Sequence, residues 1–204
     1  MKQIEETMDL VLESAKTEFL KKGYEKAKLR SIAENAGVTT GAIYVRFPNK
    51  DALFSALVSS VADHIMSLLR EGNRKGVDRL AHGASGDLWA IYNDTVKELI
   101  EYIYQNRETL ALLINCSSGS SYEYFVEKII GEEEIQVLKL LDEIKSKGFS
   151  VRDIDPKDIH ILLSAQYYTL FEVVRHKMEK KEAEQKIQLM ADFFQAGWEK
   201  VISI

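Results

Sequence analysis

Residues 29–47 read LRSIAENAGVTTGAIYVRF and predict two short helices joined by a tight turn. In the first helix, Ile32 and Ala36 recur at helical spacing and belong to one apolar face. Gly37 follows at the position where a helix commonly ends in a left-handed residue. Thr39 suits the start of the second helix, because its hydroxyl can accept a hydrogen bond from an unpaired backbone N–H. This order is typical of a helix-turn-helix, whose second helix enters the DNA major groove.

The beginning of the second helix carries small side chains that allow close approach to base edges. A threonine there offers a hydroxyl to a base and a methyl group to thymine. We expect base contacts from Thr39, Thr40, Gly41 and Ala42. Tyr44 and Arg46 lie further along the helix, where they are expected to reach phosphates.

Three cations are predicted at the unfavourable ends of two neighbouring helices. Lys28 and Arg30 lie at the start of the first helix, and Lys50 lies in the first turn of the helix that follows Pro48. A positive charge at the N-terminal end opposes the helix dipole. Nearby phosphates would explain this placement, so we add the three cations to the expected DNA contacts.

This arrangement resembles the DNA-binding domain of the tetracycline-repressor (TetR) family of transcriptional regulators. The resemblance covers residues 4–57 and rests on Ala33, Ala36, Gly37, Val38, Gly41, Tyr44, Phe47 and Lys50, with Gly23 and Tyr24 closing an earlier helix. One departure is visible, because the family often has Ser or Thr at the start of the helix that here begins near residue 28, and this chain has Ala27 and Lys28 there. The resemblance implies a dimeric, ligand-responsive regulator, a repressor that binds a palindromic double-stranded DNA operator and is released by a small-molecule effector.

Composition indicates a helical protein with a substantial core. The chain has 204 residues, of which 46% are hydrophobic and only two are proline. Its single cysteine, Cys116, excludes an internal disulfide, and we expect no cofactor and no metal. The first ten residues lack the apolar core of a signal peptide, and no apolar run is long enough to cross a bilayer. We therefore expect a cytoplasmic protein with no membrane partner.

The charge distribution permits DNA binding without predicting it. The net charge is −5. Residues 1–55 hold nine Lys and Arg against eight Asp and Glu, whereas the remainder holds 18 against 24. The less acidic part is the one expected to face DNA, so its sequence-independent affinity should be modest and sensitive to salt.

Apolar spacing predicts helices along most of the rest of the chain. They are expected over residues 3–22, 50–70, 122–131, 132–147, 156–180 and 183–203, with one helix and the start of another over 88–115. Four glycines predict a loop over 71–87 that includes a short helix near 77–81. The fold class is therefore all-α. An N-terminal three-helix helix-turn-helix domain is expected at 1–48 and a helical ligand-binding and dimerisation domain at 49–204.

The last two predicted helices carry more apolar surface than one core needs. A second copy is the simplest partner, joined through a two-fold four-helix bundle, and a larger monomer core is the alternative. The family resemblance favours the homodimer. Its interface is expected to contain Leu163, Tyr167, Leu170, Phe194, Trp198 and Val201.

A ligand pocket is expected between the middle helices, where an effector would bind. The candidate lining residues are Trp89, Tyr92, Tyr104, Cys116, Tyr122, Tyr167 and Phe171, although residues of these types more often form plain core than contact a ligand. Tyrosine hydroxyls among apolar groups suit a moderately polar aromatic or lipophilic molecule.

Two other classes of protein are alternatives to a DNA-binding regulator. An enzyme is not expected, because the four histidines form no HxxxH or HExxH pair and no GxSxG elbow occurs. A helical adaptor or small-molecule binding protein that does not bind DNA stays open as the alternative. Such a protein would have no need of the small residues Thr39, Thr40 and Gly41 ahead of Tyr44 and Lys50.

Overall fold

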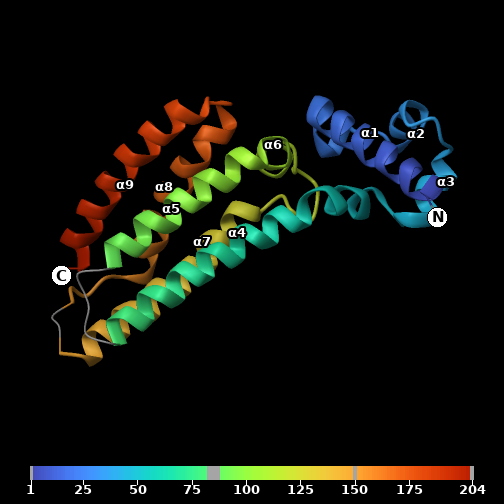
Figure 1. Cartoon of the computed structure of the whole chain (residues 1–204). Coiled ribbons are helices and arrows are strands. Elements are labelled where there is room, and N and C mark those ends of the chain that lie inside the picture. The colour runs from blue at the N-terminus through green and yellow to red at the C-terminus, as the bar shows by residue number, and fades with distance from the viewer. Residues whose placement is uncertain (1, 82–87, 149–150, 203–204) are drawn as a thin grey trace. The chain divides into compact units, whose positions relative to one another are not determined.

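The computed structural model describes residues 2–81, 88–148 and 151–202, and no strand occurs within these ranges (Figure 1). The helices are α1 (Lys2–Lys26), α2 (Leu29–Asn35), α3 (Thr40–Arg46), α4 (Lys50–Ala81), α5 (Leu88–Gln105), α6 (Arg107–Asn115), α7 (Phe125–Ser146), α8 (Pro156–Arg175) and α9 (Lys180–Ile202). The predicted all-α fold is therefore confirmed.

The chain divides into two compact units, and neither is a single continuous segment. The first unit, here called the reading unit, comprises residues 1–63 and 106–125. The second, the cavity unit, comprises residues 64–105 and 126–204. The long helix α4 contributes to both, because it passes from one to the other after Asp63. These compact units differ from the predicted domain division at residue 48.

The reading unit is built around an aromatic cluster. Phe19 of α1 and Phe54 of α4 are fully buried, and their rings meet edge to face at 5.1 Å. Tyr24 and Tyr122 add rings 5.3 Å and 6.3 Å from that of Phe54. Because Tyr122 follows α6, the cluster joins the N-terminal helices to a segment that lies far along the sequence.

The cavity unit consists of the remainder of α4 with α5, α7, α8 and α9. Among its largest buried side chains are Ile65, Leu99 and Phe171. In Figure 1, α8 and α9 lie beside each other, and α5 packs against α9. Asp155 caps α8 as the sequence indicated, since its carboxylate accepts a hydrogen bond from the Lys157 N–H at 2.9 Å.

Two predicted interruptions are absent from the described helices. The expected loop is wrong over residues 71–76, because α4 continues through Gly72 and Gly76 into the short helix expected near 77–81; residues 82–87 lie outside the described residues. Glycine costs a helix about 1 kcal/mol relative to alanine, and tertiary packing offsets this cost here. Similarly, α7 runs unbroken through Gly131, where two helices were expected.

By length and composition alone, residues 50–79 of α4 could cross a membrane, because an 18-residue window within them reaches a mean hydropathy of 1.6. Most apolar side chains of this helix do not face outward as they would in a membrane. Leu53, Phe54 and Val58 are buried in the core of the reading unit, and Ile65 and Met66 in that of the cavity unit. Core helices of water-soluble proteins have the same composition, so α4 is explained as a core element.

Candidate functional site

The turn between α2 and α3 is fixed by local hydrogen bonds. Gly37 has a φ of 68°, a backbone conformation that glycine adopts without a Cβ penalty. The N–H of Val38 then donates to the Ala33 carbonyl at 3.0 Å, which closes the end of α2. At the start of α3, the Thr39 hydroxyl accepts a hydrogen bond from the Ala42 N–H at 3.2 Å. The predicted helix-turn-helix geometry is therefore present.

One side of α3 is buried and the other is open to a partner. Ile43 is 1% exposed and anchors the helix to the core of the reading unit. On the open side, Thr39, Gly41, Ala42, Tyr44 and Arg46 are exposed, and Thr40 is half-buried. This exposed set is the one that the sequence assigned to DNA.

Val45 was missed by the sequence argument and is the most exposed large apolar side chain in α3, at 89%. It lies three residues after Ala42 and four after Gly41, so it shares their side of the helix. An aliphatic group in this position can contact a thymine methyl in the major groove. The sequence did indicate this exposure, because Val45 does not lie on the helix face that carries Ile43 and Phe47.

The three predicted phosphate-binding cations have different surroundings. Lys28 is exposed, and the exposed Arg30 pairs with Glu34 of the next helical turn at 2.8 Å. Lys50 instead directs its Nζ to the carbonyl oxygens of Tyr24, Glu25 and Ala27, at 2.7, 3.1 and 3.3 Å. An ammonium has three donors, so a phosphate contact by Lys50 would require some of these bonds to be exchanged.

The segment after α6 is attached to the helices of the reading unit by several hydrogen bonds. The Tyr24 N–H donates to the Cys116 carbonyl at 2.8 Å, and the Ser121 N–H donates to the Asp51 carboxylate at 2.9 Å. The hydroxyls of Ser55 and Tyr122 lie 3.1 Å apart. Cys116 and Tyr122, two predicted pocket residues, therefore belong to the reading unit.

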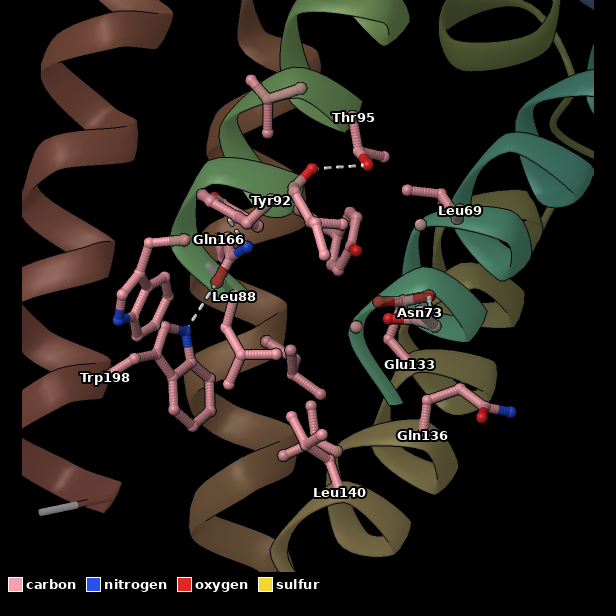
Figure 2. Close-up of a pocket in the computed structure, with 18 of the residues that line it drawn as sticks. Leu69, Asn73, Leu88, Tyr92, Thr95, Glu133, Gln136, Leu140, Gln166 and Trp198 are labelled. Carbon is pink, nitrogen blue, oxygen red and sulfur yellow. Dashed lines mark hydrogen bonds between the residues drawn. The ribbon is translucent and has the colours of Figure 1, made fainter. Parts of the chain in front are cut away.

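The cavity unit encloses a pocket of about 170 Å³ between α4, α5, α7, α8 and α9 (Figure 2). Aromatic walls come from Trp89, Tyr92, Tyr167 and Trp198. Aliphatic residues that include Leu69, Leu88, Val137, Leu140, Leu163 and Leu170 complete most of the lining. A cavity of about 150 Å³ lined by such groups holds benzene, so this one has room for a small one-ring molecule.

The pocket contains only some of the side chains that the sequence assigned to it. Trp89, Tyr92 and Tyr167 line the cavity, whereas Tyr104 and Phe171 do not. The Tyr104 hydroxyl donates to the Met178 carbonyl at 2.8 Å, and Phe171 is fully buried in the surrounding core. Burial raises the pKa of Tyr92 to about 12, so its hydroxyl stays protonated at neutral pH.

Gln166 connects three helices across one wall of the pocket. Its Nε2 donates to the Tyr92 hydroxyl at 3.0 Å, and its Oε1 accepts from Trp198 Nε1 at 2.8 Å. Figure 2 shows this bridge from α8 to α5 and α9. Gln166 was not among the predicted pocket residues, because nothing local in the sequence identifies its partners.

Glu133 lies on the other side of the cavity and was missed by the sequence argument. The side chain is buried, with 8% of the residue exposed, and accepts a hydrogen bond from Asn73 Nδ2 at 2.7 Å. The Tyr167 hydroxyl is its second hydrogen-bonding partner. Burial raises the pKa of the Glu133 carboxyl, although these two hydrogen bonds act in the opposite direction. Its spacing from Ile129, Ile130 and Val137 placed it on the apolar side of α7.

Comparison with known proteins places the reading unit in a family. Residues 11–57 match the model of the bacterial regulatory proteins of the tetR family. The N-terminal segment of the chain, residues 11–57, is therefore of the tetR-family type. The HTH-type transcriptional regulator YfiR of Bacillus subtilis is 29% identical over 140 residues, 69% of this chain and 60% of YfiR. The regulator TtgR of Pseudomonas putida is 44% identical over 59 residues, 29% of this chain and 28% of TtgR.

The matched region thus spans less than two thirds of either relative. Among solved structures, the complex of SmeT with triclosan has a TM-score of 0.63 and 22% identity, covering 94% of this chain and 90% of that chain. This likeness shows a shared fold.

At the start of α2, where the chain departs from the tetR-family pattern, a side chain from another helix bonds to the backbone. Lys28 provides no side-chain cap to this helix. The buried carboxylate of Glu18 accepts a hydrogen bond from the Lys28 N–H at 3.3 Å and pairs with Lys22 at 2.9 Å. Burial works to raise the pKa of Glu18, but the bonds from Lys22 and Lys28 outweigh it and lower the pKa.

The predicted dimer residues are largely covered within one chain. Leu163, Tyr167, Leu170 and Trp198 are buried in the cavity unit, and Phe194 and Val201 are half-buried. The large apolar side chains that α8 and α9 leave exposed are instead Ile161, Leu189 and Phe193, at 63%, 69% and 72%. The interpretation of the buried four as interface contacts therefore needs revision, because helical spacing does not distinguish two apolar faces.

Proposed function

We propose that this chain is a ligand-responsive transcriptional repressor that binds a palindromic DNA operator as a homodimer and is released by a small molecule. The observation that carries the proposal is the exposed tip of α3, where small residues precede Tyr44 on a helix anchored by Ile43. A helix tip of this kind fits the major groove. A cytoplasmic location follows from the proposed DNA target.

The proposed DNA contacts come from the helix-turn-helix. Thr39, Thr40, Gly41, Ala42 and Val45 are assigned to base edges, and Lys28, Arg30, Tyr44 and Arg46 to phosphates. Lys50 is assigned mainly to the end of α1, which it supports through three carbonyls. We keep residues 1–48 as the DNA-contacting domain in this functional sense and residues 49–204 as the domain for ligand binding and dimerisation.

The proposed homodimer forms through the exposed sides of α8 and α9. Ile161, Leu189 and Phe193 supply apolar surface there, and Phe194 and Val201 are partly available beside them. Exposed apolar side chains on two adjacent helices favour an isologous four-helix contact with a second copy. Two-fold symmetry then sets two reading helices about one DNA turn, or a multiple of it, apart.

The proposed release depends on chain connections between the two units. The chain passes between them within α4, between α5 and α6, and at the start of α7. A ligand that alters the packing of α4, α5 and α7 in the cavity unit therefore acts on three segments that continue into the reading unit. Coupling of about 1–3 kcal/mol is typical of such systems and changes operator occupancy about tenfold or more.

A mobility-shift titration with the DNA that flanks the gene tests this function. We expect a discrete shift that survives excess unrelated duplex and weakens at least tenfold in Tyr44→Ala. Tyr124→Ala is the matched control, since Tyr124 is a tyrosine outside the helix-turn-helix that is 67% exposed against 50% for Tyr44, and it should bind as the wild type does. A helical adaptor or binding protein of another kind would give no sequence-dependent shift, and that result would overturn the proposal.

A further inference from the structure

Glu133 places an acidic group on one side of the pocket. Among the described residues that line the cavity it is the one charged side chain, and Lys, Arg and His do not occur in that lining. Its hydrogen-bonding partners, Asn73 and Tyr167, are neutral donors. The adjacent Glu132 differs, because Arg70 binds it through two hydrogen bonds of 2.8 Å outside the lining.

A carboxylate buried beside neutral donors lacks the compensation that a cation supplies. Removing an unpaired charge from water costs several kcal/mol, and two neutral hydrogen bonds recover part of that cost. An ionised carboxylate has about four acceptor sites, so Asn73 and Tyr167 leave capacity for another donor. Burial raises the pKa of this carboxyl, whereas an ammonium beside it lowers the pKa and keeps it charged.

The aromatic walls suit the same kind of ligand. Trp89 and Tyr92 meet edge to face with ring centroids 6.0 Å apart, and Trp198 lies across the cavity from Glu133 (Figure 2). Aromatic faces attract organic cations as well as apolar groups. The amide of Gln166 is already hydrogen-bonded to Tyr92 and Trp198, so Gln166 adds no strong preference for the charge of the ligand.

We propose that the pocket binds a small lipophilic amine in its protonated form, with the ammonium group at Glu133 and the hydrocarbon between the aromatic walls. The volume of about 170 Å³ limits this ligand to about one ring with a short side chain. The regulatory meaning of this inference rests on the proposed function, in which the ligand releases the operator. The preference for a cation is a property of the cavity alone.

The chain offers a direct optical measurement of binding. It contains two tryptophans, and both line the cavity. Intrinsic fluorescence of the full chain can therefore be titrated with three probes of similar size: 2-phenylethylamine, 2-phenylethanol and phenylacetate. At pH 7 these are a cation, a neutral hydrogen-bond donor and an anion.

We expect the amine to bind at least tenfold more tightly than the alcohol, and phenylacetate to bind most weakly. In Glu133→Gln the affinity for the amine should fall at least tenfold, to that of the alcohol, while the affinity for the alcohol changes less than threefold. Glu134→Gln is the matched control, because Glu134 is the next carboxylate in sequence and lies outside the lining. It should retain the ranking of the wild type.

Equal binding of the amine and alcohol by the wild-type chain would overturn the inference, as would no saturable signal up to about 10 mM amine, beyond which binding is too weak to be specific. If Glu133→Gln fails to fold, the order in which the wild-type chain binds the three probes still tests the inference. The titration contains no DNA, and the mobility shift contains no amine. Failure of the proposed function and failure of the amine preference are therefore separate results.

Discussion

A Cβ atom added to Gly72 would lie 2.6 Å from the Oγ1 of Thr95, so α4 and α5 pass each other in the cavity unit without room for a side chain. The Thr95 hydroxyl donates to the Ile91 carbonyl at 2.9 Å, which holds its side chain in place. Gly72 and Thr95 both line the pocket. The glycine that suggested a loop in the sequence is therefore a packing requirement of a helix.

Gly72→Ala should lower the free energy of unfolding by about 1–3 kcal/mol, because overpacking outweighs the better helix propensity of alanine. Urea denaturation followed by circular dichroism measures this change. Gly131→Ala in α7 is the control, since a Cβ there meets no atom within 4 Å. That variant should gain about 0.5–1 kcal/mol. A similar gain in both variants would show that α4 and α5 are less tightly packed.

Lys50→Ala should lower stability as well as DNA affinity. Loss of the ammonium leaves the carbonyls of Tyr24, Glu25 and Ala27 without this donor, at a cost of about 1–3 kcal/mol. Lys28→Ala removes an exposed cation and should weaken binding to all duplexes with little change in stability. Thermal unfolding and DNA titration of the two variants measure the difference. Equal thermal stability of the two would argue against a structural role for Lys50.

Glu18→Gln should make the reading unit less stable at neutral pH, by about 1–3 kcal/mol, because charge-assisted bonds to Lys22 and the Lys28 N–H are weakened. The pKa of Glu18 is lowered in the folded chain. Its contribution is therefore present above the unfolded pKa of about 4.3 and is lost as the pH falls below it. Unfolding curves should separate the wild type from the variant at pH 7 and converge in acid. A gap that widened in acid would reverse the assigned sign.

Phe193→Glu should disrupt the proposed homodimer, because it places a charge at the exposed side of α9. We expect the dissociation constant to rise about 100-fold, equivalent to about 3 kcal/mol. Sedimentation equilibrium measures the change. Leu10→Glu makes the same substitution at an exposed leucine of the reading unit and should leave the assembly intact. A wild-type chain that is monomeric at all working concentrations would remove the basis of this prediction.

Thr40→Ala and Val45→Ala should change the preferred operator sequence. Thr40→Ala removes a hydroxyl and a methyl group, and Val45→Ala removes two methyl groups. We assign these groups to base edges, and a lost base contact costs about 1–3 kcal/mol at one position. Selection of binding sites from a randomised duplex pool measures the preference. Arg46→Ala is the comparison, because loss of a phosphate contact weakens all sequences alike. If both methyl-deletion variants selected the wild-type sequence, the assigned base-reading side of α3 would be incorrect.

The helix-turn-helix could be predicted from the sequence because its determinants act over a few residues. Gly37 and Thr39 set the turn through their own backbone and hydroxyl, and Ile43 marks the buried side of α3. The Asp155 cap of α8 was predictable for the same reason. Lys50 was not, because its three carbonyl partners lie 23 to 26 positions earlier in the chain.

The pocket could be predicted only in part because its walls come from distant segments. Gln166 meets Trp198 across 32 positions and Tyr92 across 74, and no local pattern encodes such pairings. Aromatic residues alone led to Tyr104 and Phe171, which pack elsewhere in the same core. Glu133 lies in a run of three acids at residues 132–134 and was not predicted as a pocket residue, although helical spacing placed it with the apolar residues of α7.

The discontinuous composition of the reading unit has a practical consequence for protein engineering. A chimaera that takes residues 11–57 from this chain would omit α6 and Tyr122, whose ring packs against Phe54 and whose hydroxyl lies beside Ser55. The transplanted segment would then expose an aromatic surface in the recipient protein. A working exchange of operator specificity should carry residues 106–125 together with the N-terminal helices, as two grafts at separate points of the recipient gene.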